Sequence, residues 1–326
     1  MKTHRTASIL AVCMMLAVPA FGRGHSIHGS KKEAFSTVVS PTVPKSMEFC
    51  GKRINLDRED MFERFDRELT SLCYGHSNTL LTIKRANRYF PEMAPILKAN
   101  GVPMDLLYLA CVESTLNPRA YSPAKAAGFW QFLPSTGRQY GLEVSDEIDE
   151  RYHVKKATEA ACRYLKQAYA KYGDWPTAMA SYNGGQGRIS GELERQMVDS
   201  SFDLYLTEET SRYVFRIMAM KAVMENPRTF GFALTPSQLY NSVECDEVAV
   251  SGPVASWPEW AIDRGINFQI LRDLNPWIRS KSLTNKDGKT YYVRVPKKGA
   301  LERSTARRHI FNNSWVKKKK TLIRKF

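Results

Sequence analysis

The sequence lacks the motifs by which metal- and nucleotide-dependent enzymes are recognised. It has six cysteines and six histidines in 326 residues, with no CxxC pair and no HExxH, so we predict no metal site. The apolar surroundings of Cys111 and Cys162 favour buried thiols over ligands. The glycine-rich stretch NGGQGR at 183–188 has no preceding strand and no GK[ST] ending, so we interpret it as a turn. We predict no cofactor.

Long hydrophobic runs are also missing, except at the start of the chain. A basic beginning, the apolar run ILAVCMMLAV and the small residues that follow it predict a secretory signal peptide over residues 1–20. A buried first helix is the alternative. Lipid attachment at Cys13 is disfavoured because Val12 precedes it, where a small residue is expected. We therefore expect export to the periplasm or cell envelope, where an odd cysteine would stay unpaired within the chain.

Acidic residues are too few to balance the basic ones, and the formal net charge is +15. Much of the excess lies in residues 298–326, which include KKKK at 317–320 and which we interpret as a basic tail. A solvated disordered end is the simplest interpretation of such a run. The functional alternative is loose contact with an anionic membrane or cell-wall surface. No RNA- or DNA-binding motif accompanies the charge, so nucleic acid is not an expected partner.

Periodicity divides the rest of the chain into three parts. Residues 21–60 are polar and rich in Gly, Ser and Pro, which is typical of a linker. Residues 61–235 are helical in texture, with apolar residues at helical spacing in 154–172 and 211–225. In residues 240–297, the strand-like stretches NSVECDEVAV and KTYYVRVP enclose two short helix-like stretches. The predicted fold class is mainly α, with a small α+β C-terminal domain.

One carboxylate is out of place in the helical part. Glu113 closes the apolar run MDLLYLACV, where burial and the negative end of a helix dipole both disfavour its ionised form. Both effects raise the pKa of a carboxyl group, and an acid that stays protonated near neutrality is suited to general acid catalysis. An ion pair with Arg119 or Lys125, or a simply solvated side chain, is the structural alternative.

No second carboxylate pairs with Glu113 in an obvious way. The acids of DEIDER, residues 146–151, are interpreted as a solvated turn. Aromatic and amide side chains gather in the nearby loops, and rings with hydrogen-bonding groups suit the apolar faces and hydroxyl edges of sugars. Core packing is the alternative for the rings, and for Phe129 and Trp130 we hold it equal to sugar binding. The loop residues concerned are Tyr121, Phe129, Trp130, Gln131, Tyr182 and Asn183.

Four motifs in a fixed order resemble the bacterial lytic transglycosylases of the soluble, goose-lysozyme-like class, especially the membrane-bound type D members. They are ES at 113–114, SPAKAAGFWQFLPSTG at 122–137, SYNGGQGR at 181–188 and ETSRYVFRI at 209–217. The resemblance implies a lysozyme-like helical catalytic domain over residues 61–235. It also implies a specific role for each matching residue.

By this resemblance Glu113 is the catalytic acid and base. The predicted substrate-binding residues are Ser114, Ser122, Gln131, Tyr182, Asn183 and Tyr213. The substrate would be the glycan strands of peptidoglycan. Lys125 departs from the family pattern, which usually has Gly there, and Ser181 and Gly185 replace alanines that commonly flank the Tyr-Asn-Gly core. The first change could alter the loop or add a charge beside the groove.

The family's reaction needs only one carboxylate. The acid protonates the oxygen between N-acetylmuramic acid and N-acetylglucosamine, then removes the proton of the muramyl 6-hydroxyl, which closes on C1 as a 1,6-anhydro ring. Hydrolysis by water, as in a muramidase, is one alternative, and a non-catalytic glycan-binding protein is another. The unit at 240–297 resembles a lysin-motif domain, a glycan-binding module, through AIDRGINFQILRDLNPWI and GKTYYVRVP. An unrelated linker domain is the alternative there.

Overall fold

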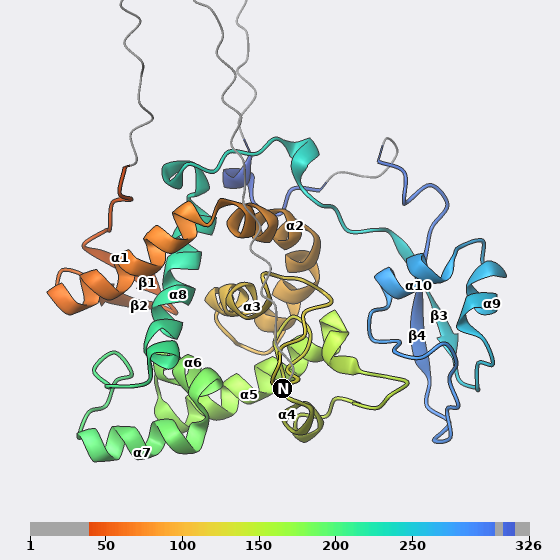
Figure 1. The fold of residues 1–326 in the computed structure, drawn as a ribbon, viewed down its shortest axis with the longest axis horizontal. Coiled ribbons are helices and arrows are strands. Elements are labelled where there is room, and N and C mark those ends of the chain that lie inside the picture. The colour runs from red at the N-terminus through yellow and green to blue at the C-terminus, as the bar shows by residue number, and fades with distance from the viewer. Residues whose placement is uncertain (1–38, 304–308, 317–326) are drawn as a thin grey trace, which may run out of the picture. The chain divides into compact units, whose positions relative to one another are not determined.

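The structure, a computed structural model, describes residues 39–303 and 309–316 (Figure 1). The predicted signal peptide at 1–20 and the KKKK run at 317–320 lie outside these ranges. Helices dominate, and each of the two sheets in the described residues has two strands. This confirms the predicted fold class, mainly α with a small α+β unit near the C-terminus. Within the same residues, no helix has both the length and the apolar character needed to span a bilayer.

A β-hairpin opens the described part of the chain and corrects the linker expected over residues 21–60. Strand β1 (Ser46–Phe49) pairs antiparallel with β2 (Lys52–Asn55). Cys50 and Gly51 join them with positive φ angles of 51° and 76°, the backbone that a tight hairpin turn requires. Phe49 is fully buried in the core of the helical part. Its burial anchors a segment whose polar composition suggested a linker.

Long amphipathic helices build the core of the helical part. Helix α5 (Val154–Tyr172) has the predicted limits and ends at Gly173, which adopts the left-handed conformation. Helix α8 (Glu208–Glu225) buries its predicted stripe and packs against α1, α3 and α6, while α5 packs against α2. The remaining helices of this part are α1 (Glu59–Tyr74), α2 (His76–Ala99), α3 (Leu107–Ser114), α4 (Pro134–Gln139), α6 (Trp175–Gly184) and α7 (Gln186–Gln196).

Short 3-10 turns complete the helical part, and α3 lies inside it. Helix α3 is apolar on nearly every side, and Leu109, Ala110 and Cys111 are fully buried, as its composition predicted. Burial on all sides fixes the position of the last turn of α3, which carries Glu113. The 3-10 turns are η1 (Met104–Leu106), η2 (Glu150–Tyr152), η3 (Pro227–Phe230) and η4 (Pro236–Gln238).

The C-terminal unit has the predicted order of strand, two short helices and strand. Strand β3 (Cys245–Val250) pairs antiparallel with β4 (Tyr291–Pro296), and α9 (Trp257–Ile262) and α10 (Phe268–Leu274) lie between them in sequence. Asn275 is fully buried: its amide nitrogen donates to the carbonyl of Arg294 at 2.8 Å, and its amide oxygen accepts from the Arg294 N–H at 2.8 Å. This reciprocal pair ties the end of α10 to β4.

Part of the basic tail is folded, which corrects the solvated end expected over residues 298–326. The turn η5 (Asn313–Trp315) places the Trp315 ring in the core with 1% of its surface exposed. The Trp315 indole N–H donates to the Met224 carbonyl at 2.6 Å, and Phe311 packs edge-on against Phe90 at 5.4 Å. Burial of the Trp315 ring and partial burial of Phe311 hold this segment against the helical part.

Candidate active site

Glu113 lies in the last turn of α3, half-buried, and burial raises the pKa of its carboxyl group from 4.5 to about 7. The Tyr213 hydroxyl on α8 donates a hydrogen bond to Glu113 Oε1, which favours the ionised form and opposes this rise. The charge of Glu209 also raises the pKa, and that of Arg216 lowers it. Burial is the largest of these effects, so the carboxyl group is protonated in half of the molecules near pH 7.

The chain turns sharply after this acid. Thr115 and Leu116 both adopt left-handed backbone with φ near 50°, which is uncommon outside glycine and costs about 1–2 kcal/mol per residue. Arg85 Nη1 donates to the Thr115 carbonyl at 3.0 Å and caps the end of the helix. The fully buried Leu116 side chain compensates for its strain by packing. The strained backbone therefore begins two residues after Glu113, whose carboxyl group has a raised pKa.

The ion pairs proposed as the structural alternative for Glu113 are not formed. Arg119 pairs with Asp273 of α10 instead, and no cation lies within 4 Å of the Glu113 carboxylate in the part of the chain that the structure describes. The hydrogen-bond donor to the Glu113 carboxyl group is instead the neutral hydroxyl of Tyr213. A half-buried acid without an ionic partner keeps its proton more readily, which suits general acid catalysis.

Two tyrosines converge on Glu113 from different helices. The Tyr182 hydroxyl on α6 donates to the Trp130 carbonyl at 2.7 Å, and burial raises the pKa of both tyrosines well above the usual value. After burial, the negative charge of Glu113 raises the pKa of both tyrosines most, so both phenols lie close enough to Glu113 to interact with its charge. Both hydroxyls are therefore neutral donors, and Tyr182 in addition holds the loop that follows Glu113.

Three of the predicted substrate-binding residues brace this loop. Ser114 is buried, and its hydroxyl lies 3.0 Å from the Ala110 carbonyl and 2.9 Å from that of Phe129, so the structure gives it a positioning role. Ser122 Oγ accepts from the Ala126 N–H at 3.1 Å. Gln131 donates its amide to the Gly128 carbonyl at 2.8 Å. These bonds shape the loop from inside.

Asn183 belongs to a polar chain at the end of α6. Its amide oxygen accepts from the Thr210 hydroxyl at 2.8 Å, and its amide nitrogen donates to Glu209 at 3.4 Å. Gly185, with φ of 84°, separates α6 from α7 and is the turn expected in NGGQGR. This single-residue break leaves Asn183 half-buried beside the start of α8.

The aromatic residues of the loop divide between core and surface. Phe129 and Trp130 each expose 1% of their surface, and the Trp130 indole N–H donates to Thr158 Oγ1 at 3.0 Å. The core interpretation is therefore correct for these two rings. Tyr121 is 60% exposed, so its ring remains available to a ligand.

Asp149 and Arg151 form a buried pair that corrects the solvated turn expected over 146–151. The Arg151 guanidinium donates to Asp149 at 2.9 and 2.7 Å and to the carbonyls of Lys125 and Phe132 at 2.7 and 2.9 Å. A Cβ at Gly128, where φ is 76°, would lie 1.9 Å from the Arg151 carbonyl oxygen. The sequence signal for this brace was weak: two apolar residues, Ile148 and Tyr152, flank the charges.

The described residues contain no group of three or more His, Cys, Asp or Glu side chains that could hold a metal ion. Cys111 and Cys162 are buried, as predicted. The cysteines in this part of the chain are all free thiols. The chemistry that this site offers is proton transfer by Glu113, whose carboxyl group has a raised pKa and lies near the neutral hydroxyls of Tyr182 and Tyr213.

Comparison with known proteins gives the family of each part. A transglycosylase SLT domain matches residues 93–202, and a soluble lytic transglycosylase C-terminal LysM-like domain matches residues 246–299. Membrane-bound lytic murein transglycosylase D of Escherichia coli strain K12 is 32% identical over 260 residues, 77% of this chain and 56% of that protein. The chain thus spans about half the length of that relative.

Two further relatives have related names. Membrane-bound lytic murein transglycosylase C of Glaesserella parasuis is 30% identical over 137 residues, 35% of this chain and 38% of that protein. The solved soluble lytic transglycosylase SLT70 of E. coli is 21% identical over 42% of this chain and 24% of that one, with a TM-score of 0.38, which adds nothing to the sequence matches. By those matches residues 93–202 belong to the transglycosylase SLT family, and residues 246–299 to the C-terminal LysM-like domains of soluble lytic transglycosylases.

Proposed function

We propose that the chain is a peptidoglycan lytic transglycosylase in which Glu113 acts first as acid and then as base. Protonated Glu113 gives its proton to the oxygen between N-acetylmuramic acid and N-acetylglucosamine, and the bond from C1 to that oxygen breaks. The resulting carboxylate takes the proton of the muramyl 6-hydroxyl, whose oxygen bonds to C1 as a 1,6-anhydro ring. The observation that carries this proposal is the Glu113 pKa of about 7, which makes both protonation states accessible near neutrality.

Hydrolysis to a reducing end is the second candidate. The observation that favours it is a second carboxylate, Glu209, close enough for its charge to raise the Glu113 pKa. A glycosidase that uses water needs a second carboxylate as base or nucleophile. Glu209 influences the Glu113 pKa through its charge, but Asn183 donates to it and it lies at the start of α8. We favour the transglycosylase because its chemistry uses a single carboxyl group, and Glu113 is the carboxyl group with a raised pKa among the described residues.

The other predicted residues take supporting roles in this proposal. Tyr213 holds the Glu113 carboxyl group in position through its hydrogen bond. Tyr182 and Ser114 hold the loop through the carbonyls of Trp130 and Phe129. Gln131 uses its amide nitrogen within the loop, and its amide oxygen has no hydrogen bond to any described residue. That oxygen is available to a sugar hydroxyl, and Ser122 and Asn183 keep further hydrogen-bonding capacity for a ligand beside their internal bonds.

We extend the proposal to the arrangement of the whole chain. Residues 61–235 form the catalytic domain and residues 240–297 bind glycan, with peptidoglycan strands as the partner of both. A signal peptide at 1–20 directs the protein to the periplasm or cell envelope, in keeping with the membrane-bound name of the E. coli relative. The charged residues of the tail contact an anionic membrane or cell-wall surface.

Release of soluble fragments from purified peptidoglycan tests the proposal. We expect the wild type to clear a suspension of sacculi and Glu113→Gln to lose at least about a thousand-fold in rate, because the amide cannot transfer a proton. Glu194→Gln is the matched control, since Glu194 is exposed on α7 and lies outside the four motifs. Undiminished clearing by Glu113→Gln would refute the assignment, and an inert wild type would favour the glycan-binding alternative.

A further inference from the structure

A cleft rich in arginine lies between the catalytic loop and the LysM-like unit. It is open to solvent, with a volume of about 870 Å³. Residues from 119 to 152 form one wall, and α10 with the segment after it forms the other. The arginines that line it are Arg119, Arg138, Arg151, Arg272 and Arg279, against the carboxylates of Asp146 and Asp149.

Three of these arginines have no acidic partner. Arg151 pairs with Asp149, and Arg119 pairs with Asp273. By contrast, no carboxylate of the described residues lies within 4 Å of Arg138, Arg272 or Arg279, and the three guanidinium groups donate to backbone carbonyls. The cleft therefore carries an uncompensated positive charge.

Arg272 is the most constrained of the three. Its Nε is buried without a hydrogen-bond partner among the described residues, and its Nη1 reaches only the Arg279 carbonyl, at 3.5 Å. Burial and the positive charges of Arg279 and Arg119 all lower the pKa of its guanidinium. A buried donor left unsatisfied beside like charges is costly for the free protein. An anion in the cleft offsets the repulsion among these like charges.

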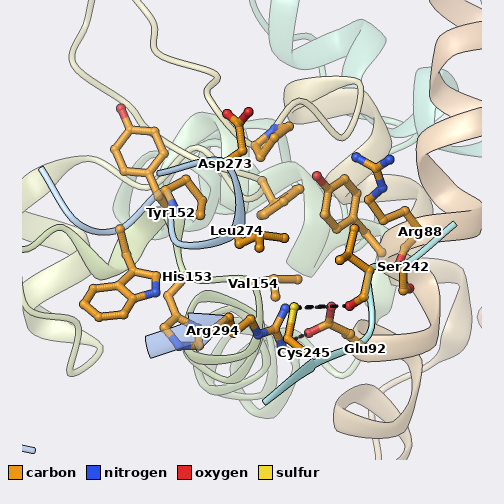
Figure 2. A pocket seen from close by; sticks show the side chains of 16 residues that line it. Arg88, Glu92, Tyr152, His153, Val154, Ser242, Cys245, Asp273, Leu274 and Arg294 are labelled. Carbon is orange, nitrogen blue, oxygen red and sulfur yellow. Dashed lines mark hydrogen bonds and ion pairs between the residues drawn. The ribbon is translucent and has the colours of Figure 1, made fainter. Parts of the chain in front are cut away.

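The geometry of the two walls is fixed by direct contacts. Ile148 and Ile278 form an antiparallel bridge, and the Asp149 N–H donates to the Trp277 carbonyl at 2.9 Å. On the far side of Tyr152, a neighbouring pocket contains the bidentate ion pair between Glu92 of α2 and Arg294 of β4 (Figure 2). Because the walls are joined by these contacts, the segments that carry the arginines are held in place before a ligand arrives.

The cleft adjoins the loop that carries the predicted sugar-binding residues. Tyr121 lines the cleft and is followed in the chain by Ser122, while Arg151 lines it and donates to the loop carbonyls of Lys125 and Phe132. A ligand attached to a glycan at Ser122 therefore needs to extend only a short way to reach the arginines.

We infer that this cleft binds the carboxylates of the peptide stems of peptidoglycan, so that the enzyme distinguishes stem-bearing glycan from bare glycan. This inference rests on the proposed function. In a stem-bearing strand both sugars are neutral, because the lactyl carboxyl group is amide-bonded to the stem, and the free carboxylates are those of the stem itself. Arginine forks match carboxylates with two parallel hydrogen bonds, whereas a neutral sugar gives no reason to gather guanidinium groups. The LysM-like unit thus contributes stem recognition through Arg272 and Arg279.

The test compares one double variant with a matched control on two substrates. Arg272→Gln/Arg279→Gln removes two charges from the cleft, and Lys281→Gln/Lys286→Gln removes two from exposed positions of the same unit that do not line it. The substrates are glycan strands with intact stems and the same strands after amidase has removed the stems, which leaves only the lactyl carboxylate close to each muramyl ring. We expect wild type and control to cleave stem-bearing strands with a kcat/KM roughly ten-fold higher, and the cleft variant to bring this ratio close to one. A ratio near one for wild type, or an unchanged ratio for the cleft variant, overturns the inference.

Binding separates failure of this inference from failure of the proposed function. Co-sedimentation of Glu113→Gln protein with both kinds of strand needs no cleavage, and we expect the preference for stems to weaken as salt is raised. Binding that ignores the stems overturns the inference even if cleavage is normal. A preference for stems that depends on Arg272 and Arg279 supports it even if the wild type cleaves nothing, an outcome that would refute only the proposed function.

Discussion

Replacing Glu113 with Gln should stabilise the protein above neutral pH. The pKa of this carboxyl group is about 7 in the fold against 4.5 for an ordinary glutamate, because burial disfavours its charge. Below pH 4.5 the group is neutral in both the folded and the unfolded chain, so it costs nothing. Between pH 4.5 and 7 the unfolded chain ionises first and folding stability falls, and above pH 7 the full cost is present.

The size of this effect follows from the shift. A difference of 2.5 pH units at about 1.36 kcal/mol per unit gives roughly 3 kcal/mol at pH 8 and less than about 1 kcal/mol at pH 5. Glutamine keeps the shape and still accepts from Tyr213, but it cannot ionise. Denaturant unfolding of wild type and Glu113→Gln, followed by tryptophan fluorescence at both pH values, measures the difference directly. A variant that is no more stable at pH 8, or whose advantage does not change with pH, would refute the raised pKa.

The remaining predictions concern the same site and its loop. Tyr213→Phe removes the hydrogen bond that lowers the Glu113 pKa, so the alkaline limb of the pH–rate profile should move up; Glu209→Gln removes a charge that raises it, so the limb should move down. A common direction for both shifts would contradict this account. Gly128→Ala should destabilise by roughly 2–4 kcal/mol, because its Cβ would meet a backbone carbonyl at 1.9 Å; a loss below about 1 kcal/mol would show that the loop yields. Lys125→Gly should stabilise by about 0.5 kcal/mol in thermal unfolding, because Lys125 has φ of 66°; destabilisation would show that its side chain makes a useful contact.

Helices with strong spacing were predictable because their burial repeats along the chain. Helix α5 has the predicted limits, since its apolar positions recur every three or four residues and Gly173 ends it. The same logic placed Glu113 at the end of a buried helix. Its lack of an ionic partner could not be read from the sequence, because it depends on where Arg119 finds Asp273, more than 150 residues away in the chain.

Charged and polar stretches misled the prediction wherever a few apolar residues decided their packing. The segment DEIDER reads as solvated, yet Asp149 and Arg151 neutralise each other and satisfy two loop carbonyls. The basic tail hides Trp315, whose burial fixes residues 309–316 against the helical core. In both cases the backbone carbonyls that accept the decisive hydrogen bonds are distant in sequence, at Lys125 and Phe132 for Arg151 and at Met224 for Trp315, so periodicity does not reveal them.

The central claim is that Glu113 works without a water nucleophile, and the products of cleavage test it most directly. Peptidoglycan is digested by the wild type in water enriched in oxygen-18, and the released muropeptides are weighed by mass spectrometry. The account predicts fragments ending in 1,6-anhydromuramic acid, lighter than a reducing end by one water and free of the label. Reducing ends that carry oxygen-18 would contradict it and would show that a second group, with Glu209 the first to test, activates water.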